Sequence, residues 1–251
     1  MKDDLGTEVT VAAPRRVVSL VPSLTEAVAG TGLLVGATDY CTHPAGLDVT
    51  RVGGSKYPSL DRVGALAPDL VLANAEENRR EDVAALRSAG FAVWVTFPLS
   101  VDEALGSLSR LFTALDEPVP PWLAAAGTAW SAVPRQRHAD RAIVPVWRRP
   151  WVVLGGGTFA GDVLARLGVR HCYATHADRY PRPTLAELRA LDPDLVVLPD
   201  EPYPFSAADG PGAFPGRRCA LVSGRHLTWY GPSLVDAPAV LAAQLAATVQ
   251  A

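Results

Sequence analysis

One stretch of the sequence occurs twice, and this repeat limits the chain to architectures made of two similar halves. The segment LDRVGALAPDLVLA, which begins at Leu60, matches LAELRALDPDLVVLP, which begins at Leu185, with Asp69 and Asp194 in the same position. Each copy follows a short apolar run, a helix-like segment and a Tyr-x-Thr-His tetrad. The tetrads are Tyr40–His43 and Tyr173–His176. Because the matched elements follow one another in the same order, we expect two lobes built on one plan.

Short apolar runs alternate with helical patterns in both halves. RRVVSLV is a β-rich run that meets Pro22, and Ser23 with Glu26 forms a capping-box pattern that predicts a helix running to about Gly32. APDLVLA and FAVWVTF predict buried strands, and EENRREDVAALRSAG between them predicts an amphipathic helix ended by Gly90. Strands that alternate with helices indicate parallel sheets covered on both faces. The predicted fold class is therefore α/β, with two Rossmann-like lobes and mainly parallel sheets.

A helical stretch lies between the two halves. SVDEALGSLSRLF predicts a helix with a capping box at Ser100 and Glu103, and the prolines of DEPVPP stop it. WLAAAGTAWSAV then predicts a helix of about 12 residues, roughly 20 Å long, which is enough to bridge two lobes once. We therefore expect an N-terminal lobe over 1–118, a connecting backbone helix over 119–135 and a C-terminal lobe over 136–251.

The charge balance limits the classes of partner. Lys and Arg total 23 against 26 Asp and Glu, so the formal net charge is −3. Nucleic-acid binding needs a basic surface that neutralises several phosphates, so we expect no nucleic-acid partner. No apolar run approaches the roughly 18 residues that a membrane-spanning helix needs.

The first residues and the cysteines bear on the compartment. MKDDLGTEVTVAAP carries two aspartates where a signal peptide has its basic region, and no apolar stretch follows. The sequence as written predicts a cytoplasmic protein, or an extracytoplasmic one if a leader has been removed. Cys41, Cys172 and Cys219 are odd in number and irregularly spaced, which favours reduced thiols over a disulfide framework.

These segments together resemble a known family, the two-lobed substrate-binding proteins of ABC importers for cobalamin, haem and iron siderophores. The resemblance runs from about Arg15 to the C-terminus, and its order and spacing are most similar to the cobalamin-binding branch. It implies the helical-backbone periplasmic-binding-protein fold, in which two Rossmann-like lobes are joined by one long helix. The segments that carry it are RRVVSLVPSLTEAVAGTGL, GATDYCTHP, VGGSKYPSLDRVGALAPDLVLA, WRRPWVVLGGGTFAGDVLARLG, RYPRPTLAELRALDPDLVVLPDEPYPF and LTWYGP.

The resemblance also implies a ligand site. The family binds its ligand in the cleft between the lobes, with loops at the carboxyl ends of strands, where open α/β sheets place ligands. Tyr40 matches a cleft tyrosine that packs on the corrin ring, and Tyr180 takes the position of an aromatic in the opposite lobe. Flat rings suit a macrocycle because stacking buries a large area with few rotors to freeze. Five more aromatic residues complete the candidate set, although each could pack against its own lobe instead: Tyr57, Trp151, Tyr203, Trp229 and Tyr230.

Arg148, in WRRPW, is a candidate for meeting an anionic group of the ligand, because a guanidinium offers a two-pronged hydrogen-bonding fork. A surface arginine explains the same position. Two features depart from the cobalamin-binding pattern. Asn74 stands where that branch can carry a tryptophan, and the stretch Pro199–Arg218 predicts an irregular surface loop where a helix is common.

The family docks onto its membrane permease through one carboxylate in each lobe. Asp61 matches the first of these positions. The second position holds Ala186, and Glu187 stands beside it. Asp61 and Glu187 are therefore the predicted docking residues, with a solvated surface carboxylate as the alternative for Glu187.

A metal site is an alternative use of the two tetrads. Cys41 and His43 near one tetrad, with His171, Cys172 and His176 near the other, are ligand types that suit zinc or another late transition metal. The spacings match no standard structural site, and an apolar strand context favours a buried thiol at Cys172. His43 or His176 as a single axial ligand to cobalt or haem iron is a separate possibility. The corresponding second function is a cytosolic metal or tetrapyrrole binding and escort protein.

An enzyme is the least favoured interpretation. Gly155, Gly157 and Gly161 lie between a strand and a helix, but their spacing is GxGxxxG rather than the dinucleotide-binding GxGxxG. A tight strand-to-helix turn with Thr158 as the helix cap explains them. No nucleophile elbow or separated carboxylate pair is present. We therefore expect a monomeric, non-catalytic protein without a built-in cofactor, which captures a corrinoid or metal chelate for a possible ABC permease.

Overall fold

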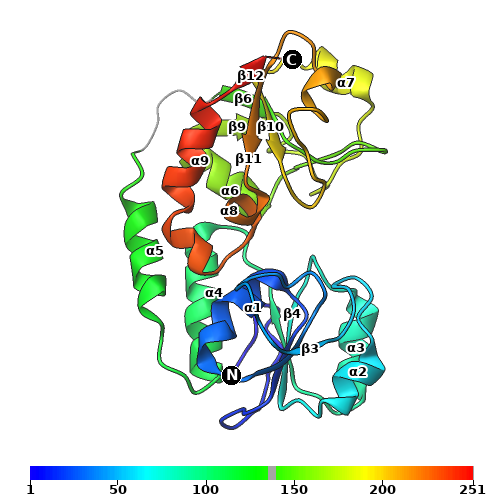
Figure 1. Ribbon diagram of the computed structural model, residues 1–251, viewed down its shortest axis with the longest axis vertical. Helices are drawn as coiled ribbons and strands as arrows, with labels where there is room; N and C mark the ends of the chain where they lie inside the picture. The colour runs from blue at the N-terminus through cyan, green and yellow to red at the C-terminus, as the bar shows by residue number, and fades with distance from the viewer. Residues whose placement is uncertain (135–139, 251) are drawn as a thin grey trace. The chain divides into compact units, whose positions relative to one another are not determined.

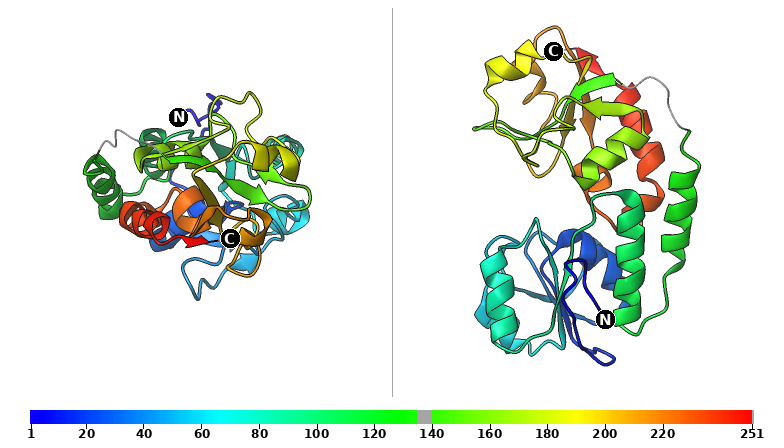
Figure 2. Two further views of the ribbon diagram at one scale, coloured as in Figure 1. Left: turned by 90° about the horizontal axis from the view of Figure 1, so that it is seen from above. Right: turned by 180° about the vertical axis from the view of Figure 1, so that it is seen from behind.

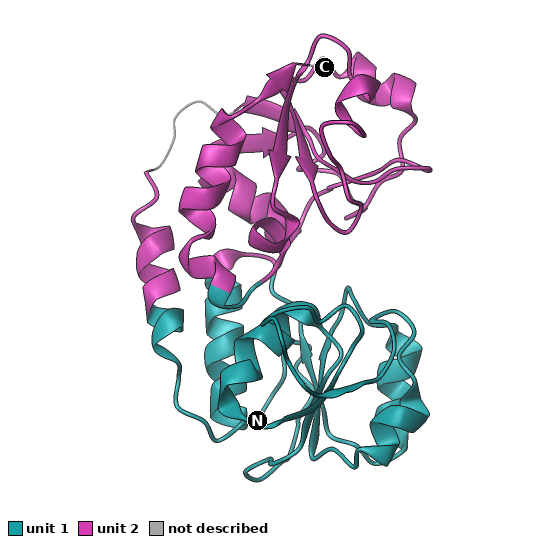
Figure 3. Cartoon of the chain, in the orientation of Figure 1, with its two compact units in different colours: residues 1–98, 102–124, 230–232 teal, residues 99–101, 125–229, 233–251 magenta. Residues whose placement is uncertain are grey.

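The computed structural model describes residues 1–134 and 140–250, and these divide into two compact units. The first unit takes residues 1–98, 102–124 and 230–232, and the second takes 99–101, 125–229 and 233–251 (Figure 3). Each unit contains its own five-stranded sheet.

The sheet of the first unit is entirely parallel, with the strand order β3-β2-β1-β4-β5 (Figure 1). Helices α2 and α3 cover one face and α1 and α4 the other (Figures 1 and 2), as right-handed crossovers require. All five residues of the interior strand β4 are buried, which is typical of a parallel sheet covered on both sides. The strands are β1 (Val17–Ser19), β2 (Leu34–Ala37), β3 (Thr50–Arg51), β4 (Leu70–Asn74) and β5 (Val93–Thr96). The helices are α1 (Pro22–Val28), the 3₁₀ turn η1 (Ala29–Thr31), α2 (Leu60–Ala65), α3 (Arg80–Ser88) and α4 (Val101–Ala114).

The sheet of the second unit has the order β12-β11-β10-β6-β9, and only β12 runs antiparallel. A hairpin, β7–β8, follows β6. On one face lie α6, α8 and α9, and on the other lies α7 (Figures 1 and 2). The strands are β6 (Asp140–Ile143), β7 (Pro145–Trp147), β8 (Val152–Val153), β9 (Val169–His171), β10 (Leu195–Pro199), β11 (Arg218–Val222) and β12 (Val249–Gln250). The helices are α6 (Phe159–Arg166), α7 (Leu185–Ala190), η2 (Pro211–Ala213), α8 (Gly224–Thr228), η3 (Pro232–Val235) and α9 (Ala237–Ala246).

The α/β class and the mainly parallel sheets are as the sequence predicted. Helix α5 (Pro121–Ser131) falls on the predicted connecting segment, and its residues divide between the two units after Ala124. The predicted lobe boundaries at 118/119 and 135/136 stay predictions, and the second lies outside the described residues.

The internal repeat is visible in matching hydrogen bonds at the start of each sheet. Asp69 Oδ2 accepts the backbone N–H of Arg16 at 2.9 Å, and Asp194 Oδ2 accepts that of Arg141 at 2.9 Å. The same two arginine side chains donate to the carbonyl oxygens of the residues that end α2 and α7, Leu66 and Leu191. Two halves built on one plan are therefore a structural fact and not only a sequence pattern.

The first nine residues fold back on the first unit. The Asp3 carboxylate pairs with Arg87 at 2.9 Å, and the Asp4 carboxylate pairs with Arg110 at 2.6 Å. Asp4 also accepts the backbone N–H of Phe97 at 2.8 Å. The two aspartates thus attach this segment to β5, α3 and α4.

Three local predictions were wrong. Ser23 and Glu26 form no capping box, because α1 begins one residue earlier at Pro22, whose fixed φ suits the first turn. Helix α3 begins only at Arg80, because the residues before it turn around Asn74. The stretch Pro199–Arg218 is not a simple surface loop, since Phe205 and Phe214 from it join the core of the second unit.

Candidate functional site

The strand order gives each sheet one switch point, where the connections from two neighbouring strands turn to opposite sides. In the first unit the connections leave β1 and β4 in opposite directions, so the loops after these strands diverge. The corresponding strands in the second unit are β6 and β10. Open parallel sheets bind ligands outside the carboxyl ends of strands at such points. The loops at the two carboxyl edges, each within its own unit, are therefore the candidate ligand-contacting segments.

Two exposed tyrosines lie at the carboxyl edge of the first sheet. Tyr40, 67% exposed, follows β2, and its ring edge lies against Gly54, where an added Cβ would stand 3.3 Å from Cε2. Tyr57 is 74% exposed. The guanidinium of Arg79 lies 4.7 Å above the Tyr57 ring centroid, a cation–π geometry. Both rings, predicted from the sequence, are thus presented to solvent by loops of one edge.

The loops that carry these rings are held by side chains of the same unit. Arg51 Nη1 donates to the carbonyl oxygens of Thr38 and Cys41, on either side of Tyr40. Asn78 Nδ2 donates to the carbonyl oxygens of Leu20 and Ser55. Such bonds order the loop backbone before any ligand arrives, which reduces the entropic cost of binding.

Tyr230 belongs to the first unit and is buried there, although the sequence prediction assigned it to ligand binding. Asn74 Nδ2 donates to Tyr230 Oη at 2.7 Å, and Thr96 Oγ1 lies 2.9 Å from the same oxygen. Because Thr96 Oγ1 donates its own proton to the carbonyl of Ala73, the Tyr230 hydroxyl donates to Thr96. Burial raises the pKa of Tyr230 far above its ordinary value, so the hydroxyl keeps its proton.

The hydrogen bonds of this network show the structural role of Asn74. It stands at the end of β4, and its side chain hydrogen-bonds to four residues, Tyr230, Thr96, Glu76 and Glu77. Besides the bond to Tyr230, Asn74 Oδ1 accepts the backbone N–H groups of Glu76 and Glu77 at 2.7 and 3.1 Å. This arrangement is the turn that asparagine side chains favour. Asn74 is therefore a buried polar anchor at the end of β4.

A second group of aromatic rings surrounds the β7–β8 hairpin and the loop after β10. Trp151 stacks on Phe205 with an interplanar angle of 9°, and Trp147 meets Tyr203 edge-on at 5.7 Å. Arg148 lies 5.5 Å from the Trp151 ring and forms an ion pair with Asp209. The sequence prediction included Trp151, Tyr203 and Arg148 but missed Trp147, which is 44% exposed. Its position beside Arg148 in the same WRRPW segment was the available signal.

Asp209 joins this group of rings to the charge of Arg148. Tyr203 Oη donates to Asp209 Oδ2 at 2.5 Å, while Arg148 pairs with the other carboxylate oxygen. Arg148 is therefore already paired with a carboxylate and lies over a ring, and it is not simply a free surface charge. An anionic ligand group would have to compete with Asp209 for it.

Trp229 is buried, although the sequence prediction made it a ligand contact and such a contact requires an exposed ring. It is 8% exposed, and the guanidinium of Arg225 lies 6.0 Å from its ring centroid. Beside it, burial and then Asp200 raise the pKa of the Glu201 carboxyl. Glu201 was missed by the sequence prediction. The available signal was its position two residues after the buried strand β10.

Tyr180 is 42% exposed and follows the second tetrad. The backbone around it pairs with the glycine-rich turn, because Gly155 N–H donates to the Arg179 carbonyl at 2.8 Å. A Cβ on Gly155 would lie 2.2 Å from the Asp178 carbonyl oxygen. These glycines therefore allow close backbone packing, which is the explanation that competes with a dinucleotide fingerprint. Thr158 does precede α6, but its hydroxyl donates to the Gly155 carbonyl instead of capping the helix.

The two tetrads do not assemble a metal centre within either unit. Among residues 1–134 and 140–250, no group of three or more His, Cys, Asp or Glu side chains could hold a metal ion. Cys41 is buried with its sulfur in contact with the hydroxyls of Thr25 and Thr38, and burial raises its pKa. His43 Nδ1 lies 3.2 Å from Thr42 Oγ1, and His176 Nδ1 accepts the backbone N–H of Asp178. Axial ligation by His43 or His176 stays a prediction.

The two predicted docking carboxylates differ in their surroundings. Asp61 is exposed in the first turn of α2. Glu187 forms a capping box with Thr184, whose backbone N–H donates to Glu187 Oε2 at 2.6 Å. These hydrogen bonds lower the pKa of Glu187. The sequence shows this box as Thr-x-x-Glu, which the sequence prediction did not use.

Comparisons with known proteins found relatives by sequence and neighbours by fold. No protein-family model matches the chain. The vitamin B12-binding protein of Photorhabdus laumondii is 26% identical over 198 residues, which cover 74% of this chain and 71% of that protein. A periplasmic haem-binding protein of Pseudomonas aeruginosa superposes with a TM-score of 0.72 and 26% identity, covering 94% of each chain. The chain is a relative of these binding proteins.

The fold comparison extends to cobalamin binding proteins of known structure. The periplasmic vitamin B12 binding protein of Vibrio cholerae superposes with a TM-score of 0.71 and 19% identity, covering 93% of this chain and 97% of that one. The resemblance drawn from the sequence motifs is therefore confirmed, and so is the helical-backbone fold class. No helix among the described residues is long and apolar enough to cross a bilayer. That the rings of the two lobes face one cleft stays a prediction.

Proposed function

We propose that the chain is the substrate-binding component of an ABC importer and captures a cobalamin-like corrinoid or a related metal chelate. The observation that carries the proposal is the exposed Tyr40 ring, held against Gly54 at the carboxyl edge of the first sheet. This ring stands where the cobalamin-binding pattern places a tyrosine on the corrin. Relatives named for vitamin B12 binding support that choice of ligand.

The chemistry of the two edges suits a large, flat, partly polar guest. Tyr40 and Tyr57 offer ring faces in the first lobe, and Trp147 and Tyr180 offer exposed rings in the second. Stacking of such rings on a macrocycle contributes dispersion and apolar burial without requiring a single hydrogen-bond pattern. Arg79, over the Tyr57 ring, places a positive charge beside one of these faces.

The transport role has three further parts that belong to the same proposal. The protein acts outside the cytoplasmic membrane, as its periplasmic relatives do. It is a monomer that binds without catalysis and carries no resident cofactor, so its ligand is cargo. It hands this cargo to a permease through exposed carboxylates, of which Asp61 is the better candidate because Glu187 is engaged in its capping box.

The decisive experiment is a ligand titration followed by tryptophan fluorescence. Cyanocobalamin, haemin and a ferric siderophore are added separately, and we expect saturable quenching by cyanocobalamin. Tyr40→Ala should raise the Kd by about ten-fold, since an aromatic stack contributes about 0.5–1.5 kcal/mol beyond area burial. Tyr40→Phe should keep most of the affinity. Leu5→Ala, an exposed apolar residue on the N-terminal segment, is the matched control and should bind as the parent does. Absence of quenching by all three ligands would refute the proposal.

Haem is the second candidate ligand. A haem-binding relative has the same 26% identity as the cobalamin-binding one, and His43 stands three residues after Tyr40 in the same loop. Neutral imidazole is a common axial ligand of haem iron. If haem is the cargo, haemin should give a sharp Soret band that His43→Ala shifts, and cyanocobalamin should fail to compete.

A further inference from the structure

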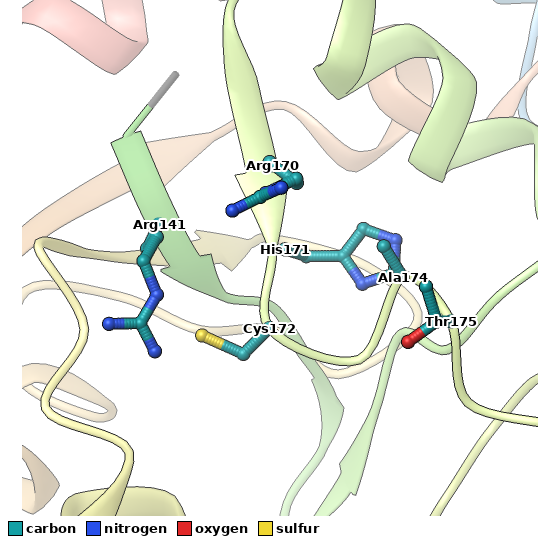
Figure 4. A pocket seen from close by; sticks show the side chains of 6 residues that line it. All are labelled: Arg141, Arg170, His171, Cys172, Ala174 and Thr175. Carbon is teal, nitrogen blue, oxygen red and sulfur yellow. The ribbon is translucent and has the colours of Figure 1, made fainter. Parts of the chain in front are cut away.

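A cavity of about 230 Å³ opens beside β9, an edge strand of the sheet in the second unit. This volume exceeds by several times the roughly 30 Å³ that one water occupies in the liquid. The cavity lies wholly within the second unit. Its lining residues are Arg141, Arg170, His171, Cys172, Ala174 and Thr175 (Figure 4).

Two guanidinium groups share one face of the sheet at this cavity. Arg141 on β6 and Arg170 on β9 are register partners, so their side chains leave neighbouring strands at the same level. Like charges directly opposite each other destabilise a strand pair. Among the described residues, 1–134 and 140–250, no ion pair joins either guanidinium to a carboxylate. Arg141 donates to the Leu191 carbonyl at 3.3 Å, and its guanidinium also interacts with the Cys172 thiol. The pair therefore presents two positive charges that no ion pair among the described residues neutralises.

Other polar side chains also line the cavity. Figure 4 shows Arg170 and Cys172 projecting to one side of β9 and the His171 ring to the other, as alternation along a strand requires. Burial raises the pKa of the Cys172 thiol, and the charges of Arg141 and Arg170 oppose that rise. Thr175 supplies an exposed hydroxyl. The Asp194 carboxylate turns one oxygen to the backbone N–H of Arg141.

We propose that this cavity binds a small oxyanion of the phosphate class between the guanidinium groups of Arg141 and Arg170. Each guanidinium offers a planar fork of N–H donors that matches the oxygens of a phosphate. The bound anion would compensate the repulsion between the two side chains and stabilise the outer edge of the second sheet. The two arginines of this site lie on β6 and β9, whereas Ala174 and Thr175 belong to the loop after β9 that also carries Tyr180. The proposal does not depend on the identity of the cargo.

Cys172 provides a built-in reporter for this site. It lines the cavity and is partly exposed, whereas Cys41 and Cys219 are 0% exposed. The rate of alkylation by N-ethylmaleimide, an uncharged reagent, is measured by peptide mass spectrometry at rising concentrations of inorganic phosphate. At a phosphate concentration of about ten times Kd, mass action leaves roughly one tenth of the sites empty, so alkylation of Cys172 should slow about ten-fold.

Two variants and one salt separate a built site from general screening. Arg170→Gln should remove the slowing by phosphate, and Arg182→Gln, an exposed arginine of the same unit outside the cavity, should keep it. Sodium chloride at the same ionic strength should leave the rate unchanged. Because removing one of two like charges favours the fold, Arg170→Gln should also melt at or above the parent temperature without phosphate and gain nothing from it. Equal slowing by chloride, no slowing by phosphate, or slowing that survives in Arg170→Gln would each overturn the proposal.

Discussion

Asn74 donates a 2.7 Å hydrogen bond to the hydroxyl of Tyr230, a residue that follows it by 156 positions in the chain. Through this bond a late segment of the sequence, residues 230–232, becomes part of the first unit. The hydroxyl lies between Asn74 and Thr96 at the carboxyl ends of β4 and β5, at the same edge of the sheet as the loops that carry the exposed tyrosines. The polar anchor therefore supports the edge at which we expect the ligand.

Tyr230→Phe tests that anchor. The variant leaves the ring in place but removes the bonds to Asn74 and Thr96, so the free energy of unfolding of the first unit should fall by about 1 kcal/mol. Hydrogen exchange of the backbone amides of β4 and β5 measures the change locally. Tyr57→Phe, which alters an exposed hydroxyl, should leave the same exchange rates unchanged. Equal rates in both variants would show that the buried network contributes nothing.

The repeated aspartates should stabilise their two lobes separately. Asp69 Oδ2 accepts the backbone N–H groups of Arg15 and Arg16 at 2.7 and 2.9 Å, while Asp194 accepts that of Arg141. Asp69→Ala and Asp194→Ala should each lower the unfolding free energy by about 1 kcal/mol, more for Asp69. The effects should add in the double variant, because the two sites share no partner. Urea unfolding followed by circular dichroism measures this, with exposed Asp48→Ala as the control.

The sequence was most informative where structure depends on local pattern. The apolar runs of β4 and β10 predicted fully buried parallel strands because both faces of such strands are covered. The match between Asp69 and Asp194 predicted two similar lobes, and both carboxylates hold equivalent backbone groups. These features need only neighbouring residues or a direct repeat.

The parts that sequence could not supply depend on contacts between distant residues. Nothing near Tyr230 shows that its partner is Asn74, so an exposed aromatic and a buried anchor look alike in the sequence. Trp229 is hidden by packing for the same reason. Glu187 is a different case, because its Thr-x-x-Glu pattern with Thr184 was present and indicated a helix cap.

The capping box of α7 should make stability depend on pH in a defined direction. Hydrogen bonds from Thr184 lower the pKa of Glu187 below its ordinary value of 4.5 in the folded protein. Its stabilising effect is therefore complete above that value and is lost as the pH falls through the lower folded pKa. The parent should unfold less readily than Glu187→Gln at neutral pH, and the difference should shrink below pH 4.5.

Thermal melts across this pH range measure the effect. Glu81→Gln, an exposed glutamate in the first turn of α3, is the matched control and should not reproduce it. A difference between parent and Glu187→Gln that stayed constant down to strongly acidic pH would assign no capping role to the carboxylate. That result would return Glu187 to the set of free docking candidates.

Gly155→Ala distinguishes backbone packing from nucleotide binding at the glycine-rich turn. An added Cβ would stand 2.2 Å from the Asp178 carbonyl oxygen and 2.9 Å from that of Arg179, and a backbone carbonyl cannot move aside as a flexible side chain can. We expect a loss of unfolding free energy of about 1–3 kcal/mol, the range for overpacking. Gly212→Ala, where nothing lies within 4 Å of the added Cβ, should cost far less. If Gly155→Ala instead folded as stably as Gly212→Ala and weakened binding of a fluorescent nicotinamide dinucleotide, close packing would no longer explain the turn.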